Sequence, residues 1–159
     1  MGAAATFGVL AGPPGSGALT NNGSNTTVTG NVGASTIHTA PAITAGYTIY
    51  TGTDAQYVDA SRDMLTAIGC AIGRTCDYNY TGVTDFSAMA AIEPLQPGVH
   101  CVTGGAMNVS SPVILELTNP GVYIFRSSGA LTSANGVTVR FSGSANAANS
   151  SVFWVPNGA

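Results

Sequence analysis

Short segments rich in Val, Ile, Thr and aromatic residues recur along most of the chain, and clusters of Gly, Pro and Asn separate them. Such segments predict short β-strands that end at turns. In the first third of the chain we expect strands at 7–12 and 27–33. After residue 74 we expect five more, at 98–102, 113–117, 122–126, 137–141 and 152–155. Strands this short, recurring every ten to fifteen residues or so, are typical of a β-sandwich, a barrel or a β-solenoid.

One segment, residues 53–73, has the pattern of a long helix. Thr53 and Gln56 have the spacing of a capping box, and Gly73 supplies a C-terminal stop. An apolar stripe is expected from the residues with helical spacing, Val58, Leu65, Ile68 and Ile72. One helix between two β-rich zones favours a solenoid with a single helix beside it. We therefore expect one domain over 1–159, with N-terminal strands at 1–52, the helix at 53–73 and the main coils at 74–159.

The chain is unusually poor in charge. Only 7% of its 159 residues are charged, against about 25% in ordinary soluble domains, and it contains no lysine. Four scattered arginines and a net charge of -3 do not make the basic patch that nucleic acid requires. No apolar run reaches the length of a membrane span, and no leader is visible. We expect an extracellular or cell-surface protein that Thr, Ser, Asn and Gly keep hydrated.

Three cysteines are present, at positions 70, 76 and 101. A disulfide suits an exported chain better than a metal site, because no Cys-x-x-Cys motif occurs. A Cys76–Cys101 bridge would close a loop worth about 3–4 kcal/mol in the chain-entropy model. Cys70–Cys76 is the alternative bridge. If Cys76 pairs with Cys101, we expect Cys70 to be a small buried residue on the helix.

No catalytic or metal-binding constellation is apparent, and no cofactor is expected. Asp59 and Asp63 stand four residues apart, and we interpret them as a solvated helix face rather than an acid–base pair. His38 is expected on a polar strand, and His100 is expected to alternate outward beside Cys101. Asp77 and Asp85 are too few ligands to hold calcium. The chain is therefore predicted not to be an enzyme.

Several segments together resemble a large microbial ice-binding protein family. The order and spacing of its motifs match over nearly the whole chain. The matching segments are Phe7–Gly12, Leu19–Asn21, Val28–Gly33, the helix, Leu95–Cys101, Asn119–Phe125, Leu131–Thr132 and Asn149–Val155. The resemblance implies a discontinuous right-handed β-solenoid, mostly β, with one long α-helix packed alongside it. It also supports the Cys76–Cys101 disulfide.

The first functional hypothesis, from the resemblance, is ice binding by a flat solenoid face that bears Thr, Ser and Asn. Rows of threonine hydroxyls and methyls, one strand apart, would order water into an ice-like layer. The candidate surface residues are the threonines of the short strands and turns, Thr27, Thr29, Thr36, Thr51, Thr53, Thr81, Thr84, Thr132 and Thr138.

Two alternatives remain open. Members of the family usually continue past the 152–155 strand, and coils left open there would expose edge strands. The second hypothesis is therefore a structural subunit, in which each chain completes its neighbour head to tail in an extracellular filament. A third hypothesis is a cell-surface adhesin module. The expected partners are accordingly an ice surface or copies of the same chain.

Overall fold

The computed structural model describes residues 2–22, 26–110 and 114–157. The chain divides into two compact units, Met1–Cys70 and Ala71–Ala159. Short parallel strands form most of each unit, as the predominance of β-type segments predicts. Each unit is described by itself below.

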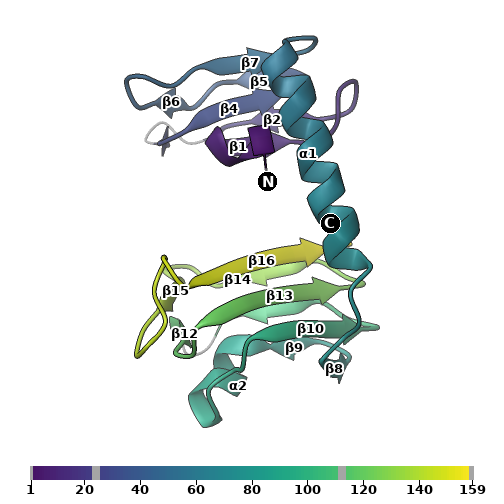
Figure 1. Ribbon diagram of the computed structural model, residues 1–159, viewed down its shortest axis with the longest axis vertical. Coiled ribbons are helices and arrows are strands. Elements are labelled where there is room, and N and C mark those ends of the chain that lie inside the picture. Colours follow the sequence, from purple (N-terminus) through teal and green to yellow (C-terminus); the bar gives the residue numbers. More distant parts are fainter. Residues whose placement is uncertain (1, 23–25, 111–113, 158–159) are drawn as a thin grey trace. The chain divides into compact units, whose positions relative to one another are not determined.

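The described residues of the first unit form three small parallel sheets (Figure 1). After a 3-10 helix at Gly2–Thr6, its strands are β1 (Phe7–Ala11), β2 (Ala18–Thr20), β3 (Thr27–Val28), β4 (Asn31–Ala34), β5 (Thr36–Thr39), β6 (Ala42–Ile43) and β7 (Ile49–Thr51). The sheets are β1-β4-β7, β2-β5 and β3-β6. The chain thus visits the three sheets in the same order twice and then returns to the first.

A glycine corner divides the segment that was predicted as one strand over 27–33. β3 ends at Val28, and β4 begins at Asn31 in a different sheet. Between them Gly30 has φ +134°, and a Cβ atom there would lie 2.5 Å from the backbone nitrogen of Gly8. The β-branched alternation predicted the extended backbone correctly, but Gly30 turns the chain through a corner that only glycine fits.

The long helix α1 (Ala55–Ile72) confirms the helix expected at 53–73. Asp54, rather than Thr53, directly precedes its first turn, and the Asp54 carboxylate accepts the Thr51 N–H at 2.7 Å. The expected apolar stripe is wrong, because Leu65, Ile68 and Ile72 are exposed.

Small and hydroxyl-bearing residues form the buried face of α1 instead. Tyr57, Ala60 and Ser61 are fully buried. The Tyr57 hydroxyl donates to the carbonyl groups of Ala11 and Gly12, at 3.2 and 3.1 Å. The helix therefore packs against the corner after β1 through close polar contacts rather than through large apolar side chains.

The second unit repeats a similar path with longer strands. Its elements are β8 (Tyr78–Thr81), β9 (Thr84–Asp85), α2 (Phe86–Ile92), β10 (Gly98–Thr103), β11 (Met107–Val109), β12 (Ile114–Leu117), β13 (Gly121–Ser127), β14 (Leu131–Ser133), β15 (Thr138–Phe141) and β16 (Ser150–Pro156). They form the parallel sheets β16-β13-β10-β8, β14-β11-β9 and β12-β15. The five strands expected after residue 74 are confirmed, except that Val113 lies outside the described residues.

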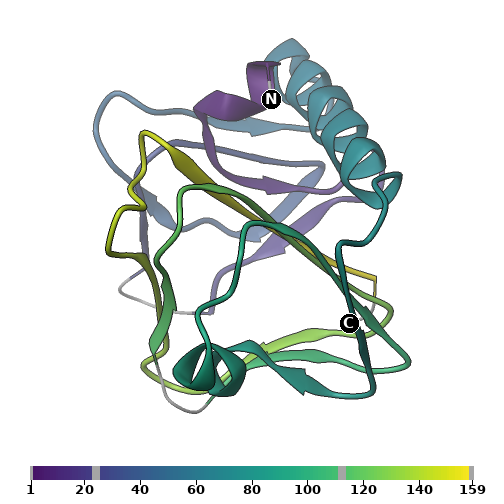
Figure 2. The ribbon, with the colours of Figure 1, turned by 60° about the horizontal axis from the view of Figure 1, so that its bottom comes forward.

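Helix α2 was not predicted, so the expectation of a single helix is wrong. Helix α2 follows β9 in the same way that β12 follows β11 and β15 follows β14, so it takes the place of a strand. It packs beside β11 and β12 (Figure 2). The seven residues of α2 are too few to show a helical period, and the helix depends on Asp85 as its N-cap.

An aromatic ladder runs through the core of the second unit. Tyr78, His100, Phe125 and Trp154 occupy matching positions on the four strands of the largest sheet. Successive ring centroids are 4.5, 4.9 and 4.4 Å apart. These rings pack with a cluster of buried residues that includes Phe86, Leu95, Val102, Met107, Val109, Leu115, Leu117 and Tyr123.

The opposite face of the same sheet is apolar as well. Val99, Cys101 and Ile124 form a second buried cluster with Ala71, from the last turn of α1. Strand β10 is therefore buried on both faces, as parallel strands often are. His100 is 1% exposed, and the expectation that it alternates outward is wrong.

Candidate functional site

The threonines that the sequence singles out do not form one surface. Eight of the nine are exposed, namely Thr27, Thr29, Thr36, Thr51, Thr53, Thr81, Thr132 and Thr138. They are spread over β3, β5, β7, β8, β14 and β15 and over loops, and these strands belong to six different sheets. Only the side chains that share one sheet face are close enough to act together.

Thr84 is the exception in burial. Its relative exposure is 8%, and it pairs in register with the fully buried Met107. Its hydroxyl donates to the carbonyl of Gly82 at 3.4 Å. Thr84 thus points into the second unit and cannot contribute to a surface.

The structure does bring two of the nine together, on the outer face of the β3-β6 sheet. Thr27 stands opposite Ala42 in register, and the inward-facing pair Val28 and Ile43 follows. Pairing continues past the strands, because the Thr44 N–H donates to the carbonyl of Val28 at 2.9 Å. Thr29 and Thr44 are therefore the next outward pair, and their hydroxyls are 3.0 Å apart.

We call this surface the threonine face: Thr27, Thr29, Ala42 and Thr44, all of them exposed. Neighbouring strands are about 4.8 Å apart, so the side chains form two closely spaced rows. The hydrogen bond between Thr29 and Thr44 restricts the rotation of both side chains. The surface is thus an ordered array of methyl and hydroxyl groups.

The strands around the threonine face carry no charge. Residues 1–53 contain no Asp, Glu, Lys or Arg, yet they hold 11 of the 19 threonines in the chain. The charged residues of the first unit lie in α1 or directly before it, at Asp54, Asp59, Arg62 and Asp63. Arg62 pairs with Asp59 at 3.1 Å, as expected for a solvated helix face.

Every sheet of the second unit carries a charged side chain. Glu116 and Arg140 pair across β12 and β15, with Arg140 Nε 2.7 Å from the Glu116 carboxylate. Asp85 lies in β9 beside Asn108, and Arg126 lies in β13. The strands of the first unit therefore carry no Asp, Glu, Lys or Arg, whereas every sheet of the second unit carries at least one.

His100 is a structural residue of the core. Its Nε2–H donates to the carbonyl of Gln96 at 2.9 Å, so its Nδ1 accepts from the Tyr80 hydroxyl, also at 2.9 Å. Burial lowers the pKa of His100, although the Gln96 carbonyl and the Asp77 carboxylate oppose the shift. Both ring nitrogens are engaged within the core, which leaves no free nitrogen for catalysis.

Asp85 is also used structurally. Its carboxylate accepts from the N–H groups of Ser87 and Ala88 at the start of α2, and from the hydroxyls of Ser87 and Ser110. Partial burial acts to raise its pKa, but the hydrogen bonds from Ser110, Ser87 and Ala88 outweigh it and lower the pKa to about 2. Among the described residues no three His, Cys, Asp or Glu side chains cluster as metal ligands would.

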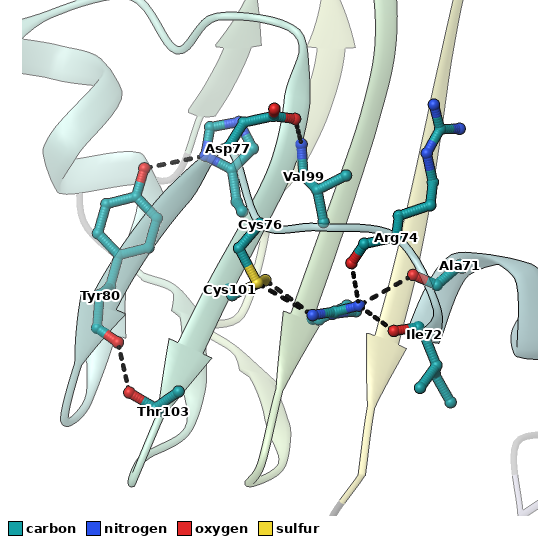
Figure 3. Close-up of a disulfide and its surroundings, with 11 residues drawn as sticks. Ala71, Ile72, Arg74, Cys76, Asp77, Tyr80, Val99, Cys101 and Thr103 are labelled. Atoms are coloured by element: carbon teal, nitrogen blue, oxygen red, sulfur yellow. Dashed lines mark hydrogen bonds between the residues drawn. A yellow bond between two sulfur atoms is a disulfide. The ribbon is translucent and has the colours of Figure 1, made fainter.

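The disulfide is the one that closes the longer of the two predicted loops. Cys76 and Cys101 form a disulfide, which Figure 3 shows beside the end of α1. Cys70 is free and exposed, so the expectation that it is buried is wrong. Within the described part of the chain, no helix is both long and apolar enough to cross a membrane.

Comparison with known proteins decides the family. A model of the ice-binding-like family matches residues 14–159. The chain belongs to the ice-binding-like family. No curated protein sequence matches the chain.

Two solved structures share the fold of this family member. An ice-binding protein from the Antarctic ascomycete Antarctomyces psychrotrophicus is 21% identical, with a TM-score of 0.62, over 98% of this chain and 72% of that one. An ice-binding protein from an Antarctic Flavobacteriaceae bacterium is 19% identical, with a TM-score of 0.57, over 96% of this chain and 35% of that one. The chain therefore spans only part of each.

Two members of the threonine face, Ala42 and Thr44, were not among the sequence candidates. Neither lies in a Thr-x-Thr pattern of its own, and only the register of β3 with β6 shows that they extend the Thr27 and Thr29 rows. One signal was available in the sequence. The run of 53 residues without Asp, Glu, Lys or Arg marks the unit whose strands carry no formal charge.

Proposed function

We propose that this protein binds ice through the threonine face of its first unit and that it acts without enzymatic chemistry. The observation that carries the proposal is the ordered Thr27/Thr29 and Ala42/Thr44 array on a strand region with no charged residue. Membership of the ice-binding-like family supports it.

The physical basis is the water held at such a surface. Apolar methyl groups restrict the orientation of first-shell water, and the neighbouring hydroxyls offer hydrogen bonds at regular positions. A charged group would orient nearby water around itself and disturb that order. The threonine face combines methyl and hydroxyl groups in rows one strand apart, and no charge interrupts them.

We propose in addition that the strands of each unit are coils of a right-handed β-solenoid. In each unit the chain visits parallel sheets in a repeated order, which supports this arrangement. Coils of this kind keep side chains of successive turns in register, and this is what aligns Thr29 with Thr44. An extracellular location, the expectation from the disulfide and the low charge, is part of the same proposal.

Thermal hysteresis and inhibition of ice recrystallisation test the proposal. Thr44→Lys places a charge in the middle of the threonine face, and we expect it to reduce thermal hysteresis by more than half at equal concentration. Thr138→Lys is the matched control, because Thr138 is an exposed threonine on the charged β12-β15 sheet. We expect the control to keep wild-type activity.

The two outcomes that count against the proposal differ. Wild-type protein without hysteresis or recrystallisation inhibition at tens of micromolar would contradict ice binding itself. Equal losses of thermal hysteresis in Thr44→Lys and Thr138→Lys would contradict the assignment of the threonine face, provided that circular dichroism shows both variants to be folded.

The self-assembly hypothesis stays a prediction. β16 lies at one end of its four-stranded sheet and has no charged residue along Ser150–Pro156. Uncharged edge strands are templates for pairing with another chain. Sedimentation of the purified protein tests it, and a monomer at all concentrations would contradict it. The adhesin hypothesis and the single domain over 1–159 also remain predictions.

A further inference from the structure

Arg126 makes an unusual set of contacts at the end of α1. Its Nη1 donates to the carbonyl groups of Ala71, Ile72 and Arg74, the first at 3.1 Å and the last at 2.9 Å. Figure 3 shows these three carbonyl groups beside the disulfide. One guanidinium nitrogen from β13 thus serves three acceptors at the point where the helix ends.

Two of these acceptors, the carbonyl groups of Ala71 and Ile72, belong to the last turn of α1. The last four carbonyl groups of a helix have no N–H donor within the helix, and a basic side chain near the C-terminus commonly satisfies them. The last turn of α1 contains no basic residue. Arg126, which is distant in sequence, takes this role and also places positive charge at the negative end of the helix dipole.

The other guanidinium nitrogen contacts the disulfide. Arg126 Nη2 lies 3.0 Å from Cys76 Sγ and 3.1 Å from Cys101 Sγ. A cation next to sulfur favours the thiolate over the thiol, so in the reduced protein it would lower the thiol pKa. Cys101 is only 4% exposed, whereas Cys76 is partly exposed, so we expect a reductant to reach Cys76 first.

We propose that Arg126 and the Cys76–Cys101 disulfide form a redox-sensitive latch on the C-terminal turn of α1. A small external thiol, as its thiolate, attacks Cys76 Sγ. The S–S bond breaks, and its electron pair leaves on Cys101 Sγ, where the Arg126 guanidinium stabilises the new thiolate. A second external thiolate attacks the external sulfur of the mixed disulfide, which releases the oxidised reductant and the Cys76 thiolate. Water then protonates the Cys76 thiolate, and the Cys101 thiolate stays paired with the Arg126 guanidinium.

Reduction changes what Arg126 binds. In the oxidised protein the guanidinium faces two neutral sulfurs and donates to the helix carbonyls. In the reduced protein a thiolate competes for the same donors, and charged acceptors form the stronger hydrogen bonds. The covalent tie between residue 76 and β10 is lost at the same time. The turn from Ala71 to Cys76 then opens, while the β10–β13 pairing is kept.

Reduction kinetics test whether Arg126 controls the sulfur chemistry. Wild type, Arg126→Gln and Arg126→Lys are reduced with dithiothreitol, and Arg140→Gln serves as the control because Arg140 pairs with Glu116 instead. A leaving thiol of lower pKa departs faster, and a neighbouring opposite charge lowers a pKa by roughly 1–3 units, so we expect reduction of Arg126→Gln to slow severalfold.

The pH profile of alkylation by iodoacetamide supplies a second readout on reduced protein. Arg126→Gln should move the alkylation profile to higher pH. Arg126→Lys should leave the profile at the pH of the wild type, because the positive charge remains. Hydrogen exchange of the 71–76 amides should be faster in reduced than in oxidised wild type. In the oxidised state it should be faster in Arg126→Lys than in wild type, because lysine lacks the planar fork of the guanidinium group.

The outcomes separate clearly. Equal reduction rates and equal alkylation profiles for Arg126→Gln and Arg140→Gln would overturn the proposal. If Arg126→Gln does not fold, the decision passes to Arg126→Lys. For Arg126→Lys, an alkylation profile like that of wild type together with faster hydrogen exchange at 71–76 would support the latch. Unchanged hydrogen exchange on reduction of the wild type would overturn it.

Discussion

Asp85→Asn provides a sharp test of how the second unit is held together. The Asp85 carboxylate caps α2 through Ser87 and Ala88 and also accepts from Ser110, directly after β11. It therefore joins β9, α2 and β11 at one point. Asparagine keeps the shape and can still cap a helix, but it loses the negative charge and one of the two acceptor oxygens.

The magnitude follows from the carboxyl pKa. Hydrogen bonding takes it from an ordinary value of 3.8 to about 2, and each pKa unit is worth about 1.4 kcal/mol. That gives about 2–3 kcal/mol as an upper value. Because Asp85 is partly exposed, solvent screening reduces it, and we expect Asp85→Asn to lower the free energy of unfolding by about 1–2 kcal/mol at pH 7.

The pH dependence identifies the cause. The folded-state pKa of Asp85 is depressed, so its contribution is fully present above the unfolded value of 3.8 and is lost as the pH falls towards 2. Urea unfolding between pH 7 and pH 2 should therefore show that the difference in the free energy of unfolding between wild type and Asp85→Asn becomes smaller below pH 4. The control is Asp59→Asn, which removes only an exposed pair with Arg62 and should stay within about 0.5 kcal/mol of wild type.

A constant difference in the free energy of unfolding between Asp85→Asn and wild type from pH 7 to pH 2 would contradict a role for the Asp85 charge. It would show that asparagine disturbs packing and that the charge contributes nothing. A loss no larger than that of Asp59→Asn would also refute it.

Three further predictions concern the second unit. Burial depresses the pKa of His100 below 6.5, so the free energy of unfolding of wild type should fall as the pH drops below 6.5. In urea unfolding, His100→Gln should remove this pH dependence. The control His38→Gln, at an exposed histidine, should keep it. Tyr123→Phe removes a buried hydroxyl that donates to the Asn119 carbonyl at 2.8 Å, and it should cost about 1 kcal/mol in the same assay; no change would show the bond to be neutral. Replacing Cys76 and Cys101 together by serine opens a loop with a sequence separation of 25 and should cost about 3–4 kcal/mol, whereas a loss below 1 kcal/mol would contradict the loop-entropy argument.

Strand positions in the second unit were predictable because their signals are local. Gly98 and Gly121 follow proline at turns, and β-branched and aromatic residues come directly after them. The order of these segments, with the helix between two β zones, also indicated the family. The disulfide followed from loop length and resemblance together.

Burial was less predictable, because it depends on what covers each face. The sequence suggested that His100 and Cys101 alternate between outside and inside, but both faces of β10 are covered. On α1, Leu65 is exposed, while Tyr57 and Ser61 are buried where their hydroxyls reach the backbone. Such choices depend on the shape of the partner surface, which periodicity does not contain.

The candidate site needed the register between strands. Thr27 and Thr29 were identifiable as a Thr-x-Thr pair, but their alignment with Ala42 and Thr44 comes from contacts between segments fifteen residues apart. Thr84 shows the reverse case, a threonine in a suggestive local pattern that points inward. Residue type alone could not separate the two.

Partition into slowly grown ice shows directly whether the threonine face binds ice. The exposed Cys70 accepts a fluorescent label, and the label lies on α1 rather than on the threonine face. We predict that labelled wild type is incorporated into the ice and that labelled Thr44→Lys is left in the liquid. Exclusion of wild type from the ice, to the same extent as the free label, would show that the protein does not bind ice.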